Sequence, residues 1–204
     1  MLRIGLTGGL ASGKSTVAEI LEDLGAAVLD ADDVVRALYR DGAEGSEAAR
    51  DLFGPRVLGP DGRVDRTRLA GIVFTDAQAR HALEARIHPL VGQARARFFA
   101  EAEAAGAAVA VVEASQLIEA GTEGDYDRVV LVMAPDEERV RRWGMKGGDP
   151  EDARRRIAAQ LAAGVARERA DDLVVNNGTR EDLRRKVTEL WTRWTAAPAD
   201  PPGA

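Results

Sequence analysis

Short apolar runs near the start of the chain and after residue 106 alternate with stretches of helical spacing. Each run is long enough for a strand buried on both faces, and each ends in a polar or turn-forming residue. Strands that alternate with helices in this order predict an α/β fold with a parallel, five-stranded sheet. The five runs are Ile4–Thr7, Ala27–Leu29, Val109–Val112, Val129–Met133 and, more weakly, Leu173–Val175.

Helical spacing dominates the rest of the chain. Apolar residues from Val17 to Leu24 recur at i, i+3, i+4 and i+7, so an amphipathic helix follows the first strand. Residues 34–106 contain no convincing strand, and their apolar spacing predicts a helical insertion beside the sheet. Residues 183–194 predict a final helix that packs on the sheet, with Trp191 and Trp194 as core residues.

Composition narrows the class of protein. With 45% hydrophobic and 30% charged residues, the chain is typical of a soluble globular protein, and the absence of cysteine excludes disulfides and thiolate zinc sites. No apolar run approaches the roughly 20 residues of a membrane span, and no export-signal pattern opens the chain. We therefore expect a cytoplasmic protein with no membrane partner, present as a monomer or small homo-oligomer.

The charge is unevenly distributed. A net charge of −6 argues against a broad nucleic-acid surface. Between Arg139 and Arg169, however, nine Lys or Arg face four Asp or Glu. This local excess of positive charge predicts a place where a small anionic ligand docks. Most of its arginines are interpreted as partners of nearby acids on solvated helix faces, with at most one or two in contact with ATP. They are Arg139, Arg141, Arg142, Arg154, Arg155 and Arg156.

The residues from Gly8 to Ser15 fit the pattern G-x-x-x-x-G-K-[ST] and lie between a predicted strand and a predicted helix. In that position, backbone N–H groups turn inward around a phosphate, and the positive end of the helix favours the anion. Gly9 and Gly13 permit the close approach that a side chain would block. The predicted nucleotide-binding residues are Gly9, Leu10, Ala11, Ser12, Gly13, Lys14, Ser15 and Thr16.

Particular roles follow within this loop. Lys14 is predicted to reach the β- and γ-phosphates of ATP as a catalytic point charge, and the Ser15 hydroxyl to be a ligand of Mg²⁺. Glu113 ends the third strand. Glu113 either binds a water molecule of the Mg²⁺ ion or is a structural acid whose hydrogen bonds are made within the protein.

Three acids, Asp30, Asp32 and Asp33, follow the second strand. Because chemistry gathers at the carboxyl ends of parallel strands, we expect them near the γ-phosphate. One carboxylate would accept the proton of an alcohol that attacks the phosphate. Spacing does not separate Asp30 from Asp32 for this role, whereas Asp33 is interpreted as the cap of the next helix.

Together these residues resemble the dephospho-CoA kinase family, which catalyses the last step of coenzyme A synthesis. Leu6–Gly9 and Lys14–Val17 are similar to the family's opening, and Leu29–Asp32 to its D-A-D segment. Further segments match in order: Asp61–Gly62, Asp65–Arg66, Val73–Phe74, Leu83–Glu84, Ile87–Leu90, Ala158–Gln160, Ala170–Asp171 and Asn176–Gly178.

The resemblance implies a three-layer P-loop kinase that uses MgATP to phosphorylate the ribose 3′-hydroxyl of dephospho-CoA, with Asp32 as catalytic base and substrate contact. It implies a nucleotide core at residues 1–33, 107–138 and 170–195, and a helical CoA-substrate insertion at 34–106. It further implies a basic lid at 139–169. The remaining residues, 196–204, are predicted to form a flexible tail.

Three residues outside the loop are candidates for ligand contacts. Arg66 opens a predicted helix, where a cation is mildly unfavourable, so we expect an anionic partner such as a CoA phosphate. His88 precedes Pro89 at a predicted helix start and has either a structural role or, as the resemblance implies, a substrate-binding role. Arg142 lies close to the predicted lid turn at 144–148 and is the arginine expected to touch ATP.

Two segments depart from the family pattern. Ser115–Glu119 stands where the family has P-L-L-x-E, so we expect a different wall on the pantetheine side. Lys146–Gly147 stands where its lid carries R-D, and Lys does not reproduce the bidentate fork of Arg on a phosphate.

Two other functions share the phosphate loop. A nucleoside or nucleotide kinase would use the same ATP machinery and differ only in the insertion and the lid. A GTPase switch is the second alternative, since Asp51–Gly54 spells D-x-x-G, but no apolar strand precedes that segment and no N-K-x-D segment follows. Selective GTP binding without acceptor-dependent hydrolysis would favour the switch.

Overall fold

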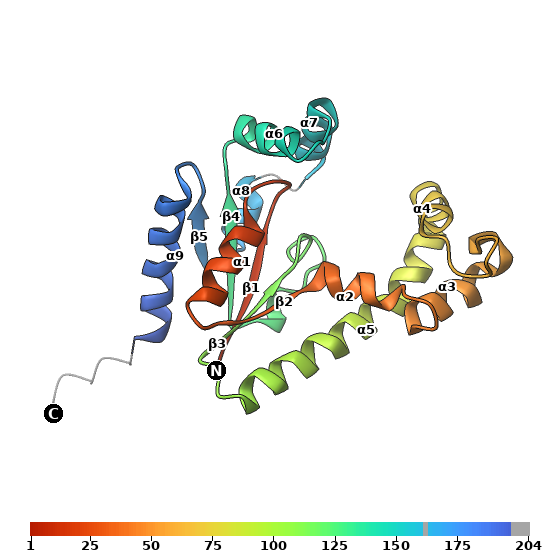
Figure 1. Cartoon of the computed structure of the whole chain (residues 1–204), viewed down its shortest axis with the longest axis horizontal. Coiled ribbons are helices and arrows are strands. Elements are labelled where there is room, and N and C mark those ends of the chain that lie inside the picture. The colour runs from red at the N-terminus through yellow and green to blue at the C-terminus, as the bar shows by residue number, and fades with distance from the viewer. Residues whose placement is uncertain (161–162, 197–204) are drawn as a thin grey trace. The chain divides into compact units, whose positions relative to one another are not determined.

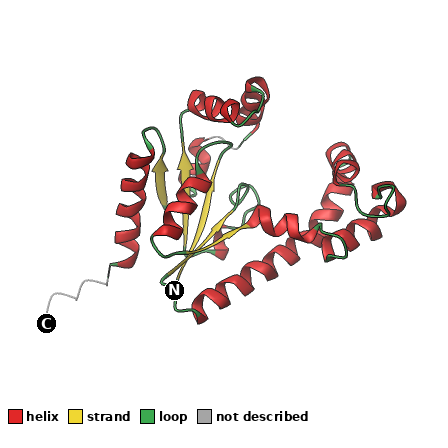
Figure 2. Ribbon diagram, in the orientation of Figure 1, coloured by secondary structure: helices red, strands yellow, loops and turns green. Residues whose placement is uncertain are grey.

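The computed structural model describes residues 1–160 and 163–196, and the chain divides into two compact units. One unit combines residues 1–29 with the chain from residue 101 onward, and the other is formed by residues 30–100. Figure 2 shows the helices, strands and loops of the chain by colour. All but the first residue of the predicted tail at 196–204 lies outside the described residues.

The first unit is built on the predicted sheet. Its strands are β1 (Leu2–Gly8), β2 (Ala27–Asp30), β3 (Val109–Glu113), β4 (Arg128–Met133) and β5 (Asp172–Val175). They lie in the order β2-β3-β1-β4-β5 (Figure 1), and β1 pairs in parallel with both β3 and β4. The predicted parallel, five-stranded sheet is confirmed, and its central strand β1 leads directly into the glycine-rich loop.

Helices cover both faces of this sheet. On one face, α1 (Lys14–Asp23) and α9 (Arg180–Thr195) pack against alternate strand residues such as Val130 and Val132. On the other face, α8 (Ala163–Glu168) and the segment after β3 pack against Val129 and Leu131. The alternation along β4 therefore gives each face its own apolar cluster, as a strand buried on both sides requires.

The final helix is confirmed. Leu183, Val187 and Leu190 are buried, and Trp191 and Trp194 pack partly buried against the same cluster. The indole Nε1 of Trp194 donates a 3.1 Å hydrogen bond to the buried carboxylate of Asp172. This bond ties the end of α9 to the edge strand β5.

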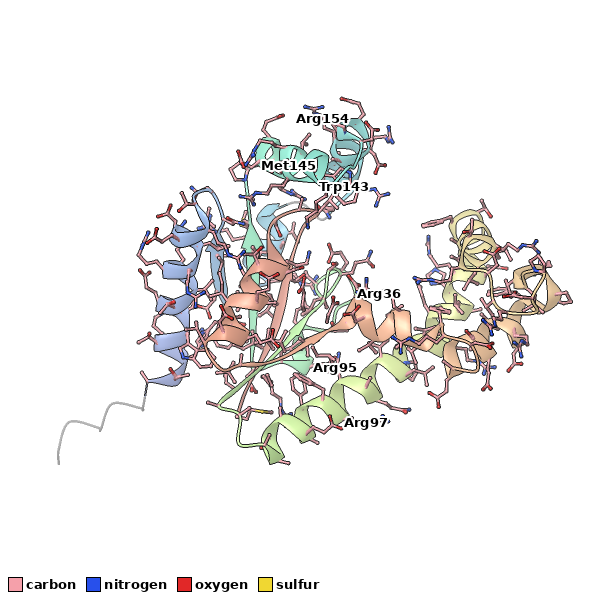
Figure 3. The ribbon with its side chains drawn as sticks, viewed as in Figure 1. Arg36, Arg95, Arg97, Trp143, Met145 and Arg154 are labelled. Carbon is pink, nitrogen blue, oxygen red and sulfur yellow. The ribbon has the colours of Figure 1, made fainter. Side chains whose placement is uncertain are left out.

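In its described residues, the basic segment at 139–169 contains most of α6 (Asp136–Met145), all of α7 (Pro150–Ala159), and α8 on the sheet. Arg141 pairs with Glu138 and Arg154 with Glu151, each at 2.8 Å, so the interpretation of these arginines as surface ion-pair partners is confirmed. The guanidinium of Arg156 lies 5.6 Å from the ring centre of Trp143 and joins α7 to α6. Figure 3 labels Trp143 and Arg154 on this helix pair.

The second unit is helical. It contains α2 (Ala31–Leu38), α3 (Glu44–Phe53), the 3₁₀ turn η1 (Gly54–Val57), α4 (Arg66–Thr75) and most of α5 (Ala77–Ala104). Its core is formed by Ala49, Phe53, Val57, Leu69, Leu83 and Ile87. Among its residues the β-pairing is a single antiparallel bridge between Leu58 and Val64, which agrees with the predicted helical character.

His88 and Pro89 do not begin a helix, so that prediction is wrong. Both lie inside α5, which continues through the proline. An interior proline costs roughly 3 kcal/mol of helix stability. The buried side chains of Leu83 and Ile87 precede it and anchor the helix in the core of the second unit, and this packing outweighs the local penalty.

No helix in the described ranges combines the length and the apolar composition that crossing a membrane requires.

Candidate active site

The loop between β1 and α1 takes a path that only small residues permit. Gly8 has a φ of 153°, and a Cβ atom there would meet the carbonyl oxygen of Val132. Gly13 has a φ of 101°, and a Cβ atom there would meet the side-chain amide of Asn176. Both positions therefore require glycine, because any other residue would be strained there and would collide with atoms of the surrounding protein.

The N-terminus of α1 is left open by its own sequence. Gly13 occupies the N-cap position and supplies no side-chain hydrogen bond, and the first turn carries no acid. By contrast, α4 is capped by Asp65 and α7 by Asp149. The first N–H groups of α1 and the positive end of its dipole are therefore available to an anion, which is the predicted phosphate site.

Ser15 and Glu113 meet at this helix end. The Ser15 hydroxyl donates a 2.9 Å hydrogen bond to Oε1 of Glu113, at the carboxyl end of β3. Within the described residues, no cluster of three or more acids or histidines is suited to hold a metal ion. A hydroxyl and a carboxylate are nevertheless the hard oxygen donors that suit Mg²⁺ when phosphate oxygens supply further ligands. The residues present fit the predicted metal role of Ser15.

Arg139 of α6 and Gln160, the residue after α7, form hydrogen bonds with the backbone of the loop. Nε of Arg139 donates to the carbonyl oxygen of Leu10 at 2.8 Å, while the side-chain oxygen of Gln160 accepts from the Leu10 N–H at 3.3 Å. Arg139 also donates to Gln160. Residue Leu10 is therefore held at both of its backbone polar groups.

A second carbonyl of the loop is held in the same way. Arg142 donates to the Ser12 carbonyl oxygen at 3.2 Å, and Nδ2 of Asn176 donates to that oxygen at 2.8 Å. Arg142 also reaches the backbone oxygen of Asn176 at 3.1 Å. The arginine expected to touch ATP thus contacts the loop's own backbone in this structure.

A cavity of about 280 Å³ opens beside the loop, at the carboxyl ends of β1 and β4. Gly8, Gly9 and Ser12 line it from the loop, and Arg139 and Gln160 line it from the helices. Of the described side chains, the Ser12 hydroxyl is one of two buried groups that lack a hydrogen-bond partner. The charged residues of its lining are one cation, Arg139, and two acids, Glu119 and Asp136. The unsatisfied Ser12 hydroxyl leaves a polar group in this cavity for a ligand or water to bond.

In the second unit, the cap of α2 is Asp30 rather than Asp33, so that interpretation is wrong. The Asp30 carboxylate accepts from the N–H groups of Asp32 at 2.7 Å and Asp33 at 3.3 Å. Asp33 instead pairs with Arg36 one turn further along the helix. The strand ends at Asp30, which places that residue at the N-cap, whereas Asp32 is exposed in the first helical turn.

Arg66 and His88 are both exposed within the second unit, Arg66 as the first residue of α4 and His88 on α5. Arg66 lies close enough to Tyr39 for its charge to act on the phenol. Burial raises the pKa of Tyr39, and the positive charge of Arg66 opposes that rise. Tyr39 therefore stays a neutral phenol at physiological pH, beside the exposed guanidinium of Arg66.

Comparisons with known proteins cover most of the chain. Residues 2–182 match the family model for dephospho-CoA kinase. A dephospho-CoA kinase of Corynebacterium glutamicum is 44% identical over 191 residues, which cover 93% of this chain and 96% of that protein.

The chain belongs to the dephospho-CoA kinase family.

Solved structures support the fold of this family member. A crystal structure of a Thermus thermophilus protein aligns with a TM-score of 0.82 at 37% identity and covers 96% of this chain and 98% of that one. A dephospho-CoA kinase from Campylobacter jejuni aligns with a TM-score of 0.69 at 23% identity, over 94% of this chain and 96% of that one. The predicted P-loop kinase fold is confirmed.

Sequence reasoning missed three residues that hold the phosphate loop of this dephospho-CoA kinase family member: Arg139, Gln160 and Asn176. Arg139 was assigned to a solvated helix face, yet its side chain is only 12% exposed. Its spacing of three residues from Arg142 would have placed both on one face of α6. Asn176 directly follows β5, so the strand-end argument applied to the aspartates would have indicated it as well.

Proposed function

We propose that this chain transfers the γ-phosphoryl group of ATP to the ribose 3′-hydroxyl of dephospho-CoA, giving ADP and CoA. The observation that carries the proposal is the glycine-rich loop on an uncapped helix, in a chain that matches the dephospho-CoA kinase family over residues 2–182. Phosphoryl transfer depends mainly on positioning and on stabilising charge, and this loop is built for both.

In the proposed reaction, the backbone from Gly9 to Thr16 surrounds the phosphates of ATP. Lys14 places its ammonium group on the β- and γ-phosphates, and Ser15 with Glu113 forms the protein side of the Mg²⁺ site. A bound Mg²⁺ ion would supply positive charge to the phosphate oxygens. These roles stabilise charge that develops as the γ-phosphoryl group leaves.

The acceptor side of the proposal rests on Asp32, Arg66 and His88. Asp32 accepts the proton of the 3′-hydroxyl, while Arg66 and His88 bind dephospho-CoA. All three side chains are exposed, and Arg66 and His88 lie within the helical unit, which supports their roles as substrate contacts. We therefore assign residues 34–106 to the CoA substrate, residues 139–169 to a lid, and residues 1–33, 107–138 and 170–195 to the nucleotide core.

We further propose a cytoplasmic enzyme, monomeric or a small homo-oligomer, that acts on small molecules and has neither nucleic acid nor a membrane as a partner. The net charge of −6 supports the exclusion of nucleic acid, because phosphate backbones are bound through clustered cations.

The proposal is tested by measuring ADP release from MgATP with dephospho-CoA, with nucleosides, or with buffer alone, and by identifying the product by mass. We expect ADP release that depends on dephospho-CoA and a product heavier by one phosphoryl group at the ribose. Equal turnover with nucleosides would favour the alternative of a nucleoside kinase. Release that is the same in buffer alone would contradict transfer to an alcohol.

The role of Glu113 in the metal site gives a separate prediction. Glu113→Gln keeps an oxygen for the Ser15 hydroxyl but removes a negative charge beside the proposed metal. We expect the Mg²⁺ concentration for half-maximal activity to rise about 10-fold, as for other residues that support a metal ligand. Glu22→Gln, an exposed change on α1, is the control and is expected to leave the Mg²⁺ dependence unchanged. The same Mg²⁺ dependence of activity in the wild type and both variants would show that Glu113 has only a structural role.

A further inference from the structure

We propose that Arg139, Arg142 and Asn176 are positioning residues that orient two peptide groups of the phosphate loop. They hold the carbonyl oxygens of Leu10 and Ser12 on the outer side of the loop. The N–H groups of Ala11 and Gly13, the next residues along the chain, are thereby directed to the inner side. This inference rests on the proposed function only in naming ATP as the ligand.

The geometry of the peptide bond links the direction of each carbonyl to that of the following N–H group. The C=O of one residue and the N–H of the next point in opposite directions across a planar trans peptide. No cis peptide bond occurs in the described chain. A side chain that fixes the Leu10 or Ser12 carbonyl therefore also fixes the direction of the N–H group of Ala11 or Gly13.

The Ser12 carbonyl is the more firmly held of the two. It accepts from Asn176 at 2.8 Å and from Arg142 at 3.2 Å, and Asn176 is itself buried with 7% of its surface exposed. Arg142 also donates to the backbone and side-chain oxygens of Asn176, which fixes the amide's orientation. Two segments far apart in the sequence, α6 and the residue after β5, thus converge on one carbonyl.

Both arginines are already engaged, which favours positioning over direct phosphate binding. Arg139 pairs with Asp136 at 3.0 Å, and Arg142 lies 3.8 Å from Glu138, so each has an acid of its own helix beside it. Their other hydrogen bonds go to the loop backbone, to the Asn176 backbone oxygen and to the side chains of Gln160 and Asn176. Asn176 carries no net charge, and its amide donates to the Ser12 carbonyl oxygen.

Positioning matters because the loop is strained where these bonds act. Gly13 has a φ of 101° and Ala11, a residue with a Cβ atom, has a φ of 52°. Left-handed backbone at a residue other than glycine is unfavourable unless the surroundings hold it. The bonds to Leu10 and Ser12, on either side of Ala11, supply that hold before the ligand arrives.

The test measures the affinity of the folded protein for MgATP and for inorganic tripolyphosphate by isothermal titration calorimetry. Asn176→Ala is expected to lower both affinities by the same factor, roughly 5- to 30-fold, because the lost bonds act on the phosphate cradle alone. Asn177→Ala is the matched control, since that exposed side chain bonds to Lys186 instead, and it should leave both affinities unchanged.

Arg142→Gln provides a second variant if Asn176→Ala does not fold, as judged by its melting curve. Arg141→Gln removes the same charge one residue earlier on α6 and is its control. We expect Arg142→Gln to lower the affinity for tripolyphosphate and Arg141→Gln to leave that affinity unchanged. Loss of MgATP affinity with tripolyphosphate affinity retained would overturn the inference and indicate contact with the nucleoside. Equal losses of tripolyphosphate affinity in both arginine variants would also overturn it. They would indicate that any positive charge on α6 attracts the anion, whatever its contacts with the loop.

The inference and the proposed function fail separately. A wild-type protein that binds tripolyphosphate and loses that affinity in the variants, but does not phosphorylate dephospho-CoA, would refute the proposed function and support the positioning role. If the wild-type protein phosphorylates dephospho-CoA but the variants bind tripolyphosphate normally, the proposed function is supported and the positioning role is refuted.

Discussion

Lys14→Ala is expected to lower kcat/KM for MgATP by roughly 10²- to 10³-fold, as for the loss of one preorganised group that stabilises transition-state charge. Lys14 is the first residue of α1, at a helix end that carries neither a side-chain cap nor an acid. Its ammonium group would therefore act on the leaving phosphates in a site where no other charge of the first turn competes.

The variant is expected to stay folded, because Lys14 is half-buried and belongs to none of the three apolar clusters. Steady-state kinetics with varied MgATP, together with a melting curve, separate loss of function from loss of structure. Lys186→Ala on α9 is the control and should change kcat/KM by less than about twofold. Near-normal turnover by Lys14→Ala would overturn the phosphate-loop assignment.

Asp32→Asn is expected to slow the chemical step by roughly 10²- to 10⁴-fold while changing ATP affinity and stability much less. The amide has nearly the shape of the carboxylate but cannot accept the proton of the attacking hydroxyl. Asp32 is exposed in the first turn of α2, and its N–H is bonded to Asp30. The change at the side chain should therefore leave the helix cap intact.

Asp33→Asn is the matched control for this change. Asp33 pairs with Arg36 on the exposed side of α2 and is not the cap, so its replacement removes one surface ion pair of small energetic value. Single-turnover phosphorylation of dephospho-CoA under saturating MgATP compares the two variants. A larger loss in Asp33→Asn would assign the base to that residue, and unchanged rates in both would show that the reaction needs no carboxylate base.

The fold could be predicted from local patterns of apolar residues, because these patterns indicate directly which residues are buried. The strand from Val129 to Met133 was recognisable from a short apolar run, and the structure shows its residues shared between two apolar clusters. The same kind of reasoning failed at Pro89, where the local preference for a helix start was overridden by the buried side chains before it. Propensity is a weak signal wherever tertiary packing opposes it.

Only the part of the candidate site formed by consecutive residues could be predicted from the sequence. The pattern from Gly8 to Ser15 contains in eight consecutive residues the glycines, the lysine and the hydroxyl that a phosphate cradle needs. The cap of α2 was assigned to the wrong residue by three positions, because the choice between Asp30 and Asp33 depends on where the strand ends. That end is fixed by pairing with a neighbouring strand, which the local sequence does not specify.

By itself, the sequence determined the class of fold, the phosphate loop and the family, since each is written in short-range order along the chain. Only the tertiary structure decided that Arg139, Arg142 and Asn176 converge on the carbonyls of Leu10 and Ser12. These contacts join residues more than 120 positions apart, and many other arginines on the same helices pair with nearby acids instead. Which arginine faces the loop depends on how α6 is seated against the sheet, and that is set by packing rather than by residue type.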